Sequence, residues 1–346
     1  MSLSASTMSS RTPISSLPPS NSDLPPTAAS SAGLRQLRCG YIALVGRPNA
    51  GKSTLFNALL GQRLSIVTAK PQTTRSRIVG ILTRPDSQMI FLDTPGLLEP
   101  SYRLHEAMTH QIERSAREAD VVLLLVDATR LDDRPDLIRR FLSSPLKGQV
   151  VVAVNKVDRL DNSAEMEKVR TRVARSLSLQ TVICISALEG YQLDSMMAEL
   201  ESHLPLGSQL YPDEMVAEQP ERFFTAELIR EAAFNQLVDE LPYSIEVVIE
   251  EFRQGNGADS DDSTAAGEEK DAPRGKAYIA ATIYVERASQ KGIVIGRKGS
   301  RLRSIGRQAR LQIEVLLEQE VYLDLRVKTR LDWRNRAQDL REFGYE

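Results

Sequence analysis

The sequence has few of the residues that mark several classes of protein. Of its 346 residues only two are cysteines, Cys39 and Cys184, too few for a disulfide framework or a cysteine-based metal site. Its three histidines match no metal-binding motif. No apolar run approaches the ~18 residues that a membrane-spanning helix needs. We therefore expect both cysteines to fill an apolar core.

The overall charge is nearly balanced, but the charges are unevenly distributed. The formal net charge is -2, with 41% hydrophobic and 26% charged residues, which is typical of a globular protein long enough for two domains. Residues 287–310 contain eight Lys or Arg and no acid, whereas 254–275 contain six acids and two bases. This asymmetry predicts a negatively charged partner for one patch rather than for the whole molecule.

The N-terminal segment has a different composition from the rest. Residues 1–33 contain eleven Ser and five Pro, and Arg11 and Asp23 are their only charged side chains. Such a segment buries too little apolar surface to offset its ordering entropy, so we expect a disordered tail over residues 1–38. An organellar transit peptide is the alternative, but transit peptides are usually rich in arginine.

Apolar strands alternate with amphipathic helices from 39 to 204. Strand-like runs such as "YIALV", "MIFLD" and "VVLLLVD" are apolar on both faces. This pattern predicts an α/β domain with a mostly parallel, doubly wound sheet, whose ligands bind at the carboxyl ends of the strands. The expected helices cover 52–60, 103–118, 134–142, 163–176 and 191–203.

A second, α+β domain is expected over 223–346, after a proline-rich linker at 205–222. Its elements read helix, strand, strand, helix, helix, strand, which is the order of the type II KH fold. The acidic segment 254–275 falls between the first two of these strands, and we expect it to be a disordered insert.

The segment "GRPNAGKS" fits the phosphate-loop pattern G-x-x-x-x-G-K-[ST] between a strand and a helix. Its backbone amides can bind phosphates, helped by the positive end of the following helix. Lys52 would reach the β- and γ-phosphates, and Ser53 would ligate Mg²⁺. The residues expected to contact nucleotide here are Gly46, Arg47, Pro48, Asn49, Ala50, Gly51, Lys52, Ser53 and Thr54.

The segment "FLDTPG" ends a later strand and is expected to face the γ-phosphate. Asp93 is placed to hold Mg²⁺ through water, and the Gly96 amide to bond the γ-phosphate, with Thr94 and Pro95 between them. A plain strand-ending turn is the alternative, because Pro and Gly are turn residues.

The segment "NKVD", Asn155, Lys156, Val157 and Asp158, decides which base is bound. Guanine presents N1–H and N2–H₂ as adjacent donors, which an ionised carboxylate such as Asp158 accepts together. Adenine would leave this carboxylate unpaired. Ser186 and Ala187, after the strand "VICI", would place a backbone N–H near guanine O6. The ligands expected are therefore GTP or GDP with Mg²⁺.

On these motifs the chain resembles the Era family of GTPases, in which a TrmE-Era-like GTPase domain precedes a type II KH domain. The resemblance covers about residues 40–346 and includes "KPQTTRSRIVGI" at 70–81, which is similar to the first switch of the family. It implies that a threonine there meets Mg²⁺ and the γ-phosphate. We favour Thr74, although the sequence does not separate it from Thr73. The expected metal ligands are Ser53, Thr74 and Asp93.

No glutamine follows D-x-x-G, where Ras-like enzymes orient the attacking water. Leu97 stands there and has no donor or acceptor, so slow intrinsic turnover is expected. The resemblance implies that Asn49 helps to hold a K⁺ that bridges the phosphates, although this asparagine is also a candidate cap of the loop. The residues expected to act in hydrolysis are Lys52, Thr74 and Asn49.

The segment "GRKG" predicts a nucleic-acid clamp in the second domain. In KH domains a G-x-x-G loop binds a nucleic-acid backbone, and here the loop opens a helix rich in arginine. A solvated surface turn is the alternative. The expected RNA-binding residues are Lys291, Gly296, Arg297, Lys298, Gly299, Arg301 and Arg303, and Ile293 and Ile295 would form an apolar floor for the bases.

The residues themselves predict a protein that binds GTP and single-stranded RNA. The resemblance implies a monomeric GTPase that binds small-subunit rRNA near its 3′ end and assists assembly of the small ribosomal subunit. A regulatory GTPase whose basic domain docks on anionic lipid is the alternative. A third class, the GTPase arm of a tRNA-modifying enzyme, would need a catalytic domain that we do not find. We expect a cytoplasmic protein, with peripheral contact to the inner membrane or a place in the plastid stroma as alternatives.

Overall fold

The computed structural model describes residues 37–131, 135–178, 181–255 and 275–345. The expected tail lies outside them except for Leu37 and Arg38, which already belong to the first strand, and so does most of the expected acidic insert. The residues from Gln36 to Glu346 form one compact unit. None of the helices in the described ranges is long and apolar enough to cross a membrane.

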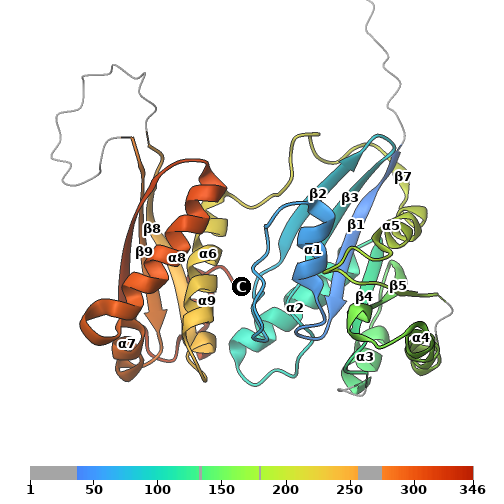
Figure 1. Cartoon of the computed structure of the whole chain (residues 1–346), viewed down its shortest axis with the longest axis horizontal. Coiled ribbons are helices and arrows are strands. Elements are labelled where there is room, and N and C mark those ends of the chain that lie inside the picture. The colour runs from blue at the N-terminus through green and yellow to red at the C-terminus, as the bar shows by residue number, and fades with distance from the viewer. Residues whose placement is uncertain (1–36, 132–134, 179–180, 256–274, 346) are drawn as a thin grey trace, which may run out of the picture. The chain divides into compact units, whose positions relative to one another are not determined.

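The N-terminal sheet is mostly parallel, as expected. Its strands run in the order β2-β3-β1-β4-β5-β6, and β7 pairs antiparallel with β1 (Figure 1). β2 is antiparallel to β3, whereas the remaining pairs of the main path are parallel. The strands are β1 (Leu37–Gly46), β2 (Ile78–Arg84), β3 (Ser87–Asp93), β4 (Val121–Asp127), β5 (Gln149–Asn155), β6 (Val182–Cys184) and β7 (Leu206–Gly207).

Helices cover both faces of this sheet. Leu55 of α1 and Met196 of α5 are buried against one face, in one cluster with Ile42 and Leu44 of β1. The helices α2, α3 and α4 pack on the other face. Each cysteine belongs to a cluster of buried apolar residues, Cys184 to the one under these helices and Cys39 to another. Cys39 and Cys184 are buried, as predicted. The helices are α1 (Lys52–Leu60), α2 (Arg103–Glu118), α3 (Pro135–Leu142), α4 (Ser163–Leu177) and α5 (Leu193–Ser202).

The segment expected as a linker packs along the edge of the N-terminal sheet. The Ile81 N–H donates to the Val216 carbonyl at 2.8 Å. The N–H groups of Leu210 and Tyr211 donate to the Gln88 side-chain oxygen at 2.9 and 3.0 Å. These bonds satisfy part of the edge strand β2 and its neighbour β3, so the segment is part of the folded structure.

The C-terminal part has the element order expected of a type II KH fold. Its sheet runs β10-β9-β8, with β9 parallel to β10 and antiparallel to β8. Ile229 of α6, Val294 of α7 and Ile305 of α8 are fully buried against one face of this sheet. The elements are α6 (Glu221–Gln236), β8 (Ile245–Arg253), β9 (Ala277–Val285), α7 (Ala288–Ile295), α8 (Ser300–Leu317), β10 (Val321–Thr329) and α9 (Ala337–Glu342).

Candidate functional site

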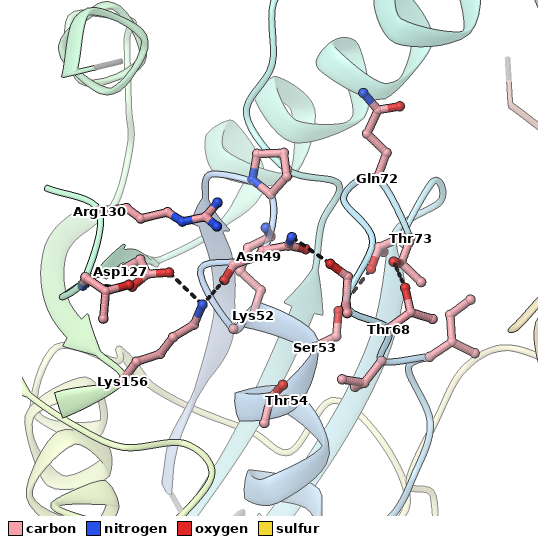
Figure 2. A pocket seen from close by; sticks show the side chains of 18 of the residues that line it. Asn49, Lys52, Ser53, Thr54, Thr68, Gln72, Thr73, Asp127, Arg130 and Lys156 are labelled. Carbon is pink, nitrogen blue, oxygen red and sulfur yellow. Dashed lines mark hydrogen bonds and ion pairs between the residues drawn. The ribbon is translucent and has the colours of Figure 1, made fainter. Parts of the chain in front are cut away.

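A hollow of about 460 Å³ lies at the carboxyl ends of the N-terminal strands, where the sequence motifs were expected to meet. Figure 2 shows side chains of the phosphate loop, the first switch segment and the end of β4 around it. The expected residues that line it are Pro48, Asn49, Gly51, Lys52, Ser53, Thr54, Thr74, Gly96 and Lys156.

Two glycines let the backbone approach closely here. Gly51 has φ 97°, and a Cβ on it would lie 2.2 Å from the Asn155 side-chain nitrogen. A Cβ on Gly96 would lie 2.6 Å from the Pro48 backbone nitrogen. The D-x-x-G turn therefore packs directly on the phosphate loop, and side chains at either position would separate the segments.

The Lys52 ammonium is held inside the phosphate loop. Its Nζ donates to the carbonyls of Gly46 and Arg47 at 3.1 and 3.2 Å. Burial lowers the pKa of Lys52 to about 8, against the opposing charge of Asp93. A buried cation with only carbonyl acceptors favours the arrival of an anion such as a phosphate.

Three oxygen-bearing side chains converge beside Lys52, as a magnesium site requires. Ser53 Oγ donates to Asp93 Oδ2 at 2.8 Å and lies 3.0 Å from Thr74 Oγ1. Ser65, which the sequence did not suggest, also donates to Asp93 Oδ2 at 2.7 Å. Asp93 Oδ1 is buried without a hydrogen-bond partner, and burial raises the pKa of this carboxyl. An unsatisfied buried oxygen among hydroxyls fits Mg²⁺, which prefers oxygen ligands.

The structure separates the two threonines of the first switch. Thr74 faces Ser53, whereas Thr73 Oγ1 bonds the Thr68 hydroxyl and the Lys70 carbonyl, both at 2.9 Å. Thr74 is thus the residue whose hydroxyl lies with Ser53 and Asp93.

Of the residues expected at the base, Lys156 lines the nucleotide hollow, whereas Asp158 and Ser186 do not. Ser186 Oγ donates to Asp158 Oδ1, and both line a neighbouring hollow with Tyr191. Asn155 points elsewhere: its Nδ2 donates to the Ala50 carbonyl and its Oδ1 accepts from the Ala187 N–H, both at 2.9 Å. Asn155 therefore joins the phosphate loop to the segment that carries Ser186.

Several other expected residues do not reach the hollow with their side chains. Thr94 Oγ1 donates to the Leu44 carbonyl at 2.7 Å and is fully buried. Ala50 is buried, and Arg47 lines a second hollow on the other side of the phosphate loop. Asn49, in contrast, lines the hollow; it has φ 64° and its Nδ2 donates to the Ala69 carbonyl at 3.1 Å. Gly46 and Pro95 are absent from the lining of the nucleotide hollow.

Sequence reasoning missed two residues at the end of β4, Asp127 and Arg130. Lys156 Nζ bonds Asp127 Oδ2 at 2.6 Å and also donates to the Asn49 carbonyl (Figure 2). Burial acts to raise the pKa of Asp127, but the hydrogen bonds from Lys156 and Thr129 outweigh it, so this pKa is lowered. A carboxylate as the last residue of the strand "VVLLLVD" was a signal that could have found Asp127.

The first switch segment forms hydrogen bonds with the C-terminal elements α6 to α9, here called the KH part, which belong to the same compact unit. The Arg75 guanidinium donates to the carbonyls of Ile245, Pro242 and Tyr243 at 2.7, 3.1 and 3.1 Å. It also pairs with Glu246 at 3.1 Å, and the Arg75 side chain is only 3% exposed.

Further bonds surround Thr73 in the same segment. Arg230 of α6 donates to the Thr73 carbonyl at 2.6 Å. Lys70 Nζ donates to the carbonyls of Leu237, at 2.7 Å, and Phe234 at the end of α6. The segment that carries Thr74 is thus held from both sides, by the nucleotide hollow and by the KH part.

The G-x-x-G loop joins α7 to α8, as expected of a KH clamp. Gly296 has φ 73°, and a Cβ on it would lie 2.8 Å from Arg301 Cβ. Gly299 has φ 75°, and a Cβ on it would meet nothing within 4 Å. Gly296 is therefore required by packing, and Gly299 leaves open space that a nucleic-acid backbone can enter.

Exposed cations surround this loop. The side chains of Lys291, Arg297 and Lys298 are exposed and form no ion pair within the described ranges. Arg301 and Arg303 are tied to the loop: Arg301 donates to the Ile293 carbonyl and Arg303 to that of Lys298, both at 2.8 Å. In contrast, cations on the open face of the KH sheet are neutralised, Arg326 by Asp324 at 2.7 Å and Lys328 by Glu250 at 3.5 Å.

Only one of the two isoleucines that were expected to contact the bases is exposed beside the loop. Ile293 is 45% exposed next to the loop, whereas Ile295 packs against the core of the KH part. The core residue between them, Val294, is fully buried.

Comparisons with known proteins agree with both parts of the chain. Residues 41–156 match the family model described as a 50S ribosome-binding GTPase, and residues 262–334 match that of the KH domain. GTPase Era of Heliobacterium modesticaldum is 39% identical over 316 residues, 90% of this chain and 99% of that protein. GTPase Era of Pseudomonas entomophila is 39% identical over 309 residues, 89% of this chain and 97% of that protein.

Two solved structures are similar over the same length. One is Era in complex with MgGDPNP and nucleotides 1506–1542 of 16S ribosomal RNA, with a TM-score of 0.82 and 38% identity over 89% of this chain and 99% of that chain. The other is an Aquifex aeolicus Era variant bound to GDP and AlF4⁻, with a TM-score of 0.81, 38% identity and the same coverage.

Proposed function

The chain belongs to the Era family of GTPases, and from this premise we propose that it is a GTP-hydrolysing switch that binds small-subunit rRNA near its 3′ end. In this role it assists assembly of the small ribosomal subunit, as a monomer. The observation that carries the proposal is the presence in one chain of a phosphate-loop hollow and a basic G-x-x-G loop. The similar Era structure with 16S rRNA identifies the class of RNA.

We assign the nucleotide's phosphates to the phosphate loop and the Gly96 amide. Lys52 would exchange its carbonyl acceptors for phosphate oxygens, because a charged acceptor forms the stronger bond. Ser53, Thr74 and Asp93 would hold Mg²⁺, which neutralises charge on the phosphates when it is bound. Ordering of the first switch then depends on Thr74, whose hydroxyl already faces Ser53.

Guanine is assigned to Asp158. The Ser186 hydroxyl bonds one carboxylate oxygen of Asp158, which fixes the orientation of the carboxylate towards a pair of donors. Asp158→Asn should weaken GTP binding by about 2–4 kcal/mol, because one charge-assisted bidentate contact is lost. The variant should favour xanthosine triphosphate, whose C2 carbonyl accepts a bond from the new amide. Unchanged preference for GTP in a competition assay would remove Asp158 from the base site.

A monovalent cation is proposed at Asn49. Its backbone is in the left-handed region, and its side chain already joins the phosphate loop to Ala69, just before the first switch. A K⁺ held there would place a fixed positive charge against the phosphates. Hydrolysis should then be faster in K⁺ than in Na⁺, and equal rates would exclude this cation while leaving the GTPase assignment intact.

We place the protein in the cytoplasm, with peripheral contact to the inner membrane and the plastid stroma as alternatives. The exposed cations of the G-x-x-G loop suit RNA phosphates and also anionic lipid, so vesicles of phosphatidylserine are a required comparison. A reporter fused to residues 1–38 would test import into plastids.

The whole proposal is tested with the full chain. Purified protein should hydrolyse GTP slowly and only with Mg²⁺, and Lys52→Ala should abolish hydrolysis. It should also bind a single-stranded RNA copied from the 3′ end of small-subunit rRNA more tightly than a duplex of the same sequence. Equal binding to both RNAs, or hydrolysis that survives Lys52→Ala, would contradict the proposal.

A further inference from the structure

Leu97, the residue after D-x-x-G, has no polar group that could orient the attacking water. Leu97 is 8% exposed and belongs to the apolar cluster under α2, α3 and α4. Negative charge on the phosphates is redistributed in the transition state, and enzymes of this class stabilise it with fixed positive charges. A positively charged side chain near the γ-phosphate would supply such stabilisation alongside the K⁺ proposed at Asn49.

A second hollow, of about 510 Å³, adjoins the nucleotide hollow across the phosphate loop. Its walls come from four places: residues 47–49 of the phosphate loop; Ala69, just before the first switch, with Pro71 and Gln72 of the switch; residues 97–99 after D-x-x-G; and Arg130 with Leu137. The walls therefore combine all the segments that are expected to surround the γ-phosphate. Five residues line both hollows: Pro48, Asn49, Ala69, Gln72 and Arg130.

Arg130 is the only cation among those five described residues. Figure 2 shows its side chain extending from the end of β4 towards Asn49 in the phosphate loop. Its backbone is fixed by a bond from its N–H to the Asp127 carbonyl at 3.1 Å.

The guanidinium of Arg130 has no competing role in the described part of the chain. The side chain is exposed and makes no hydrogen bond or ion pair there. Two of the other cations of the nucleotide hollow are already engaged: Lys52 with loop carbonyls, and Lys156 with Asp127 and the Asn49 carbonyl. The remaining one, Arg159, is exposed but does not line the second hollow, so Arg130 alone reaches both.

We infer that Arg130 is a catalytic residue that this chain supplies in cis to GTP hydrolysis. The inference deepens the proposed function and rests on it. The water oxygen bonds to the γ-phosphorus while the bond from that phosphorus to the β–γ bridging oxygen breaks. The electron pair stays on the bridging oxygen of GDP, and the proton of the water passes to the released phosphate. Arg130 stays protonated throughout and donates hydrogen bonds to the oxygens on which negative charge grows.

The experiment compares Arg130→Ala and Arg130→Lys with wild-type protein and with Arg140→Ala. Arg140 is an exposed arginine on α3 that lines neither hollow, so its variant controls for loss of one positive charge. Single-turnover hydrolysis of GTP, affinity for GDP and GDPNP, and formation of the GDP–aluminium fluoride complex are measured for each.

We expect Arg130→Ala to lower the hydrolysis rate at least about tenfold, since arginines supplied to this reaction contribute more than that in related enzymes. Its affinity for GDP and GDPNP should stay within twofold of wild type, and the aluminium fluoride complex should weaken in parallel with the rate. Arg130→Lys should recover only part of the rate, because a point charge lacks the guanidinium fork. Arg140→Ala should behave as wild type.

Two results would overturn the inference alone. A wild-type rate in Arg130→Ala would remove Arg130 from the reaction. A loss of GDP affinity as large as the loss of rate would make Arg130 a ground-state phosphate ligand instead. Absence of hydrolysis in the wild-type protein would overturn the proposed function and this inference together.

Discussion

Thr74 Oγ1 lies 3.0 Å from Ser53 Oγ, across the gap between the first switch and the phosphate loop. Both hydroxyls lie beside Asp93, whose Oδ1 is buried and unpartnered. This contact brings together residues that are far apart in sequence, and the two neighbouring threonines have different hydrogen-bond partners.

The first prediction separates these threonines. Thr74→Ala should raise the Mg²⁺ concentration needed for GTP hydrolysis and lower the rate by about ten- to hundredfold, because a hydrogen-bonding group next to charge is lost. Thr73→Ala should keep the Mg²⁺ requirement, since its hydroxyl bonds only Thr68 and the Lys70 carbonyl. Magnesium titrations of hydrolysis measure both. If Thr73→Ala raised the Mg²⁺ concentration needed for hydrolysis and Thr74→Ala did not, Thr73 would be the Mg²⁺ ligand instead.

The second prediction concerns pH. The pKa of Lys52 is lowered to about 8 in the nucleotide-free protein, and phosphate oxygens beside it would raise this pKa. Nucleotide binding must then take up a proton once the pH exceeds 8, so GTP affinity falls as pH rises. Between pH 7 and pH 8.5 we expect a loss of about fourfold.

Calorimetry in two buffers of different ionisation enthalpy at pH 8.5 measures the proton uptake. In Lys52→Arg the guanidinium stays charged, so its remaining affinity should not change over this range. Constant affinity in the wild type would show that Lys52 is fully charged before the nucleotide binds.

The third prediction concerns the buried pair of Arg75 and Glu246. Arg75→Ala leaves the Glu246 carboxylate in a site where only Tyr345 still donates to it, at 2.6 Å. Removing one partner of a buried pair costs about 3–5 kcal/mol. The denaturant midpoint of the KH part should fall accordingly.

The matched control is Arg77→Ala. Arg77 pairs with Glu118 at 2.9 Å, but these side chains are 32% and 46% exposed. Arg77→Ala should therefore lower the free energy of unfolding by less than about 1 kcal/mol. Equal shifts in the two variants would show that the Arg75 site is open to water in solution.

Local patterns predicted much of this structure. The expected helices at 52–60 and 103–118 coincide with α1 and α2, because their apolar spacing and flanking glycine or turn residues are local signals. The motif residues around Lys52 and Asp93 also met where the parallel sheet brings strand ends together. The residue types and their order along the chain are enough to predict these helices and the meeting of these motifs.

The remaining features depend on distant partners. Arg75 reads as one more polar residue of the first switch, and nothing near it in sequence shows that it will be buried among the carbonyls of 242–245. Asn155 was expected at the nucleotide, yet it joins Ala50 to Ala187. Such contacts follow from the packing of whole elements, so the local sequence cannot specify them.

The last prediction concerns the G-x-x-G loop. Changing Arg297 and Lys298 to Asp keeps both glycines, and therefore the turn, but replaces two exposed cations with two anions. Affinity for single-stranded RNA should drop by at least ~2 kcal/mol, because two favourable phosphate contacts become unfavourable ones at short range. GTP hydrolysis measured without RNA should hardly change. Binding of RNA by the wild type should weaken steeply with salt.

The matched control places the same charge change on the open face of the KH sheet. Arg326 and Lys328 are paired with Asp324 and Glu250, so changing both to Asp alters the net charge equally but removes no free cation. If the clamp binds RNA, the loop variant loses affinity much more than this sheet variant. Equal losses would mean that only overall charge matters. If the loop variant still binds RNA but no longer binds phosphatidylserine vesicles, the loop binds lipid instead, because phosphate contacts on a membrane depend on the same two cations.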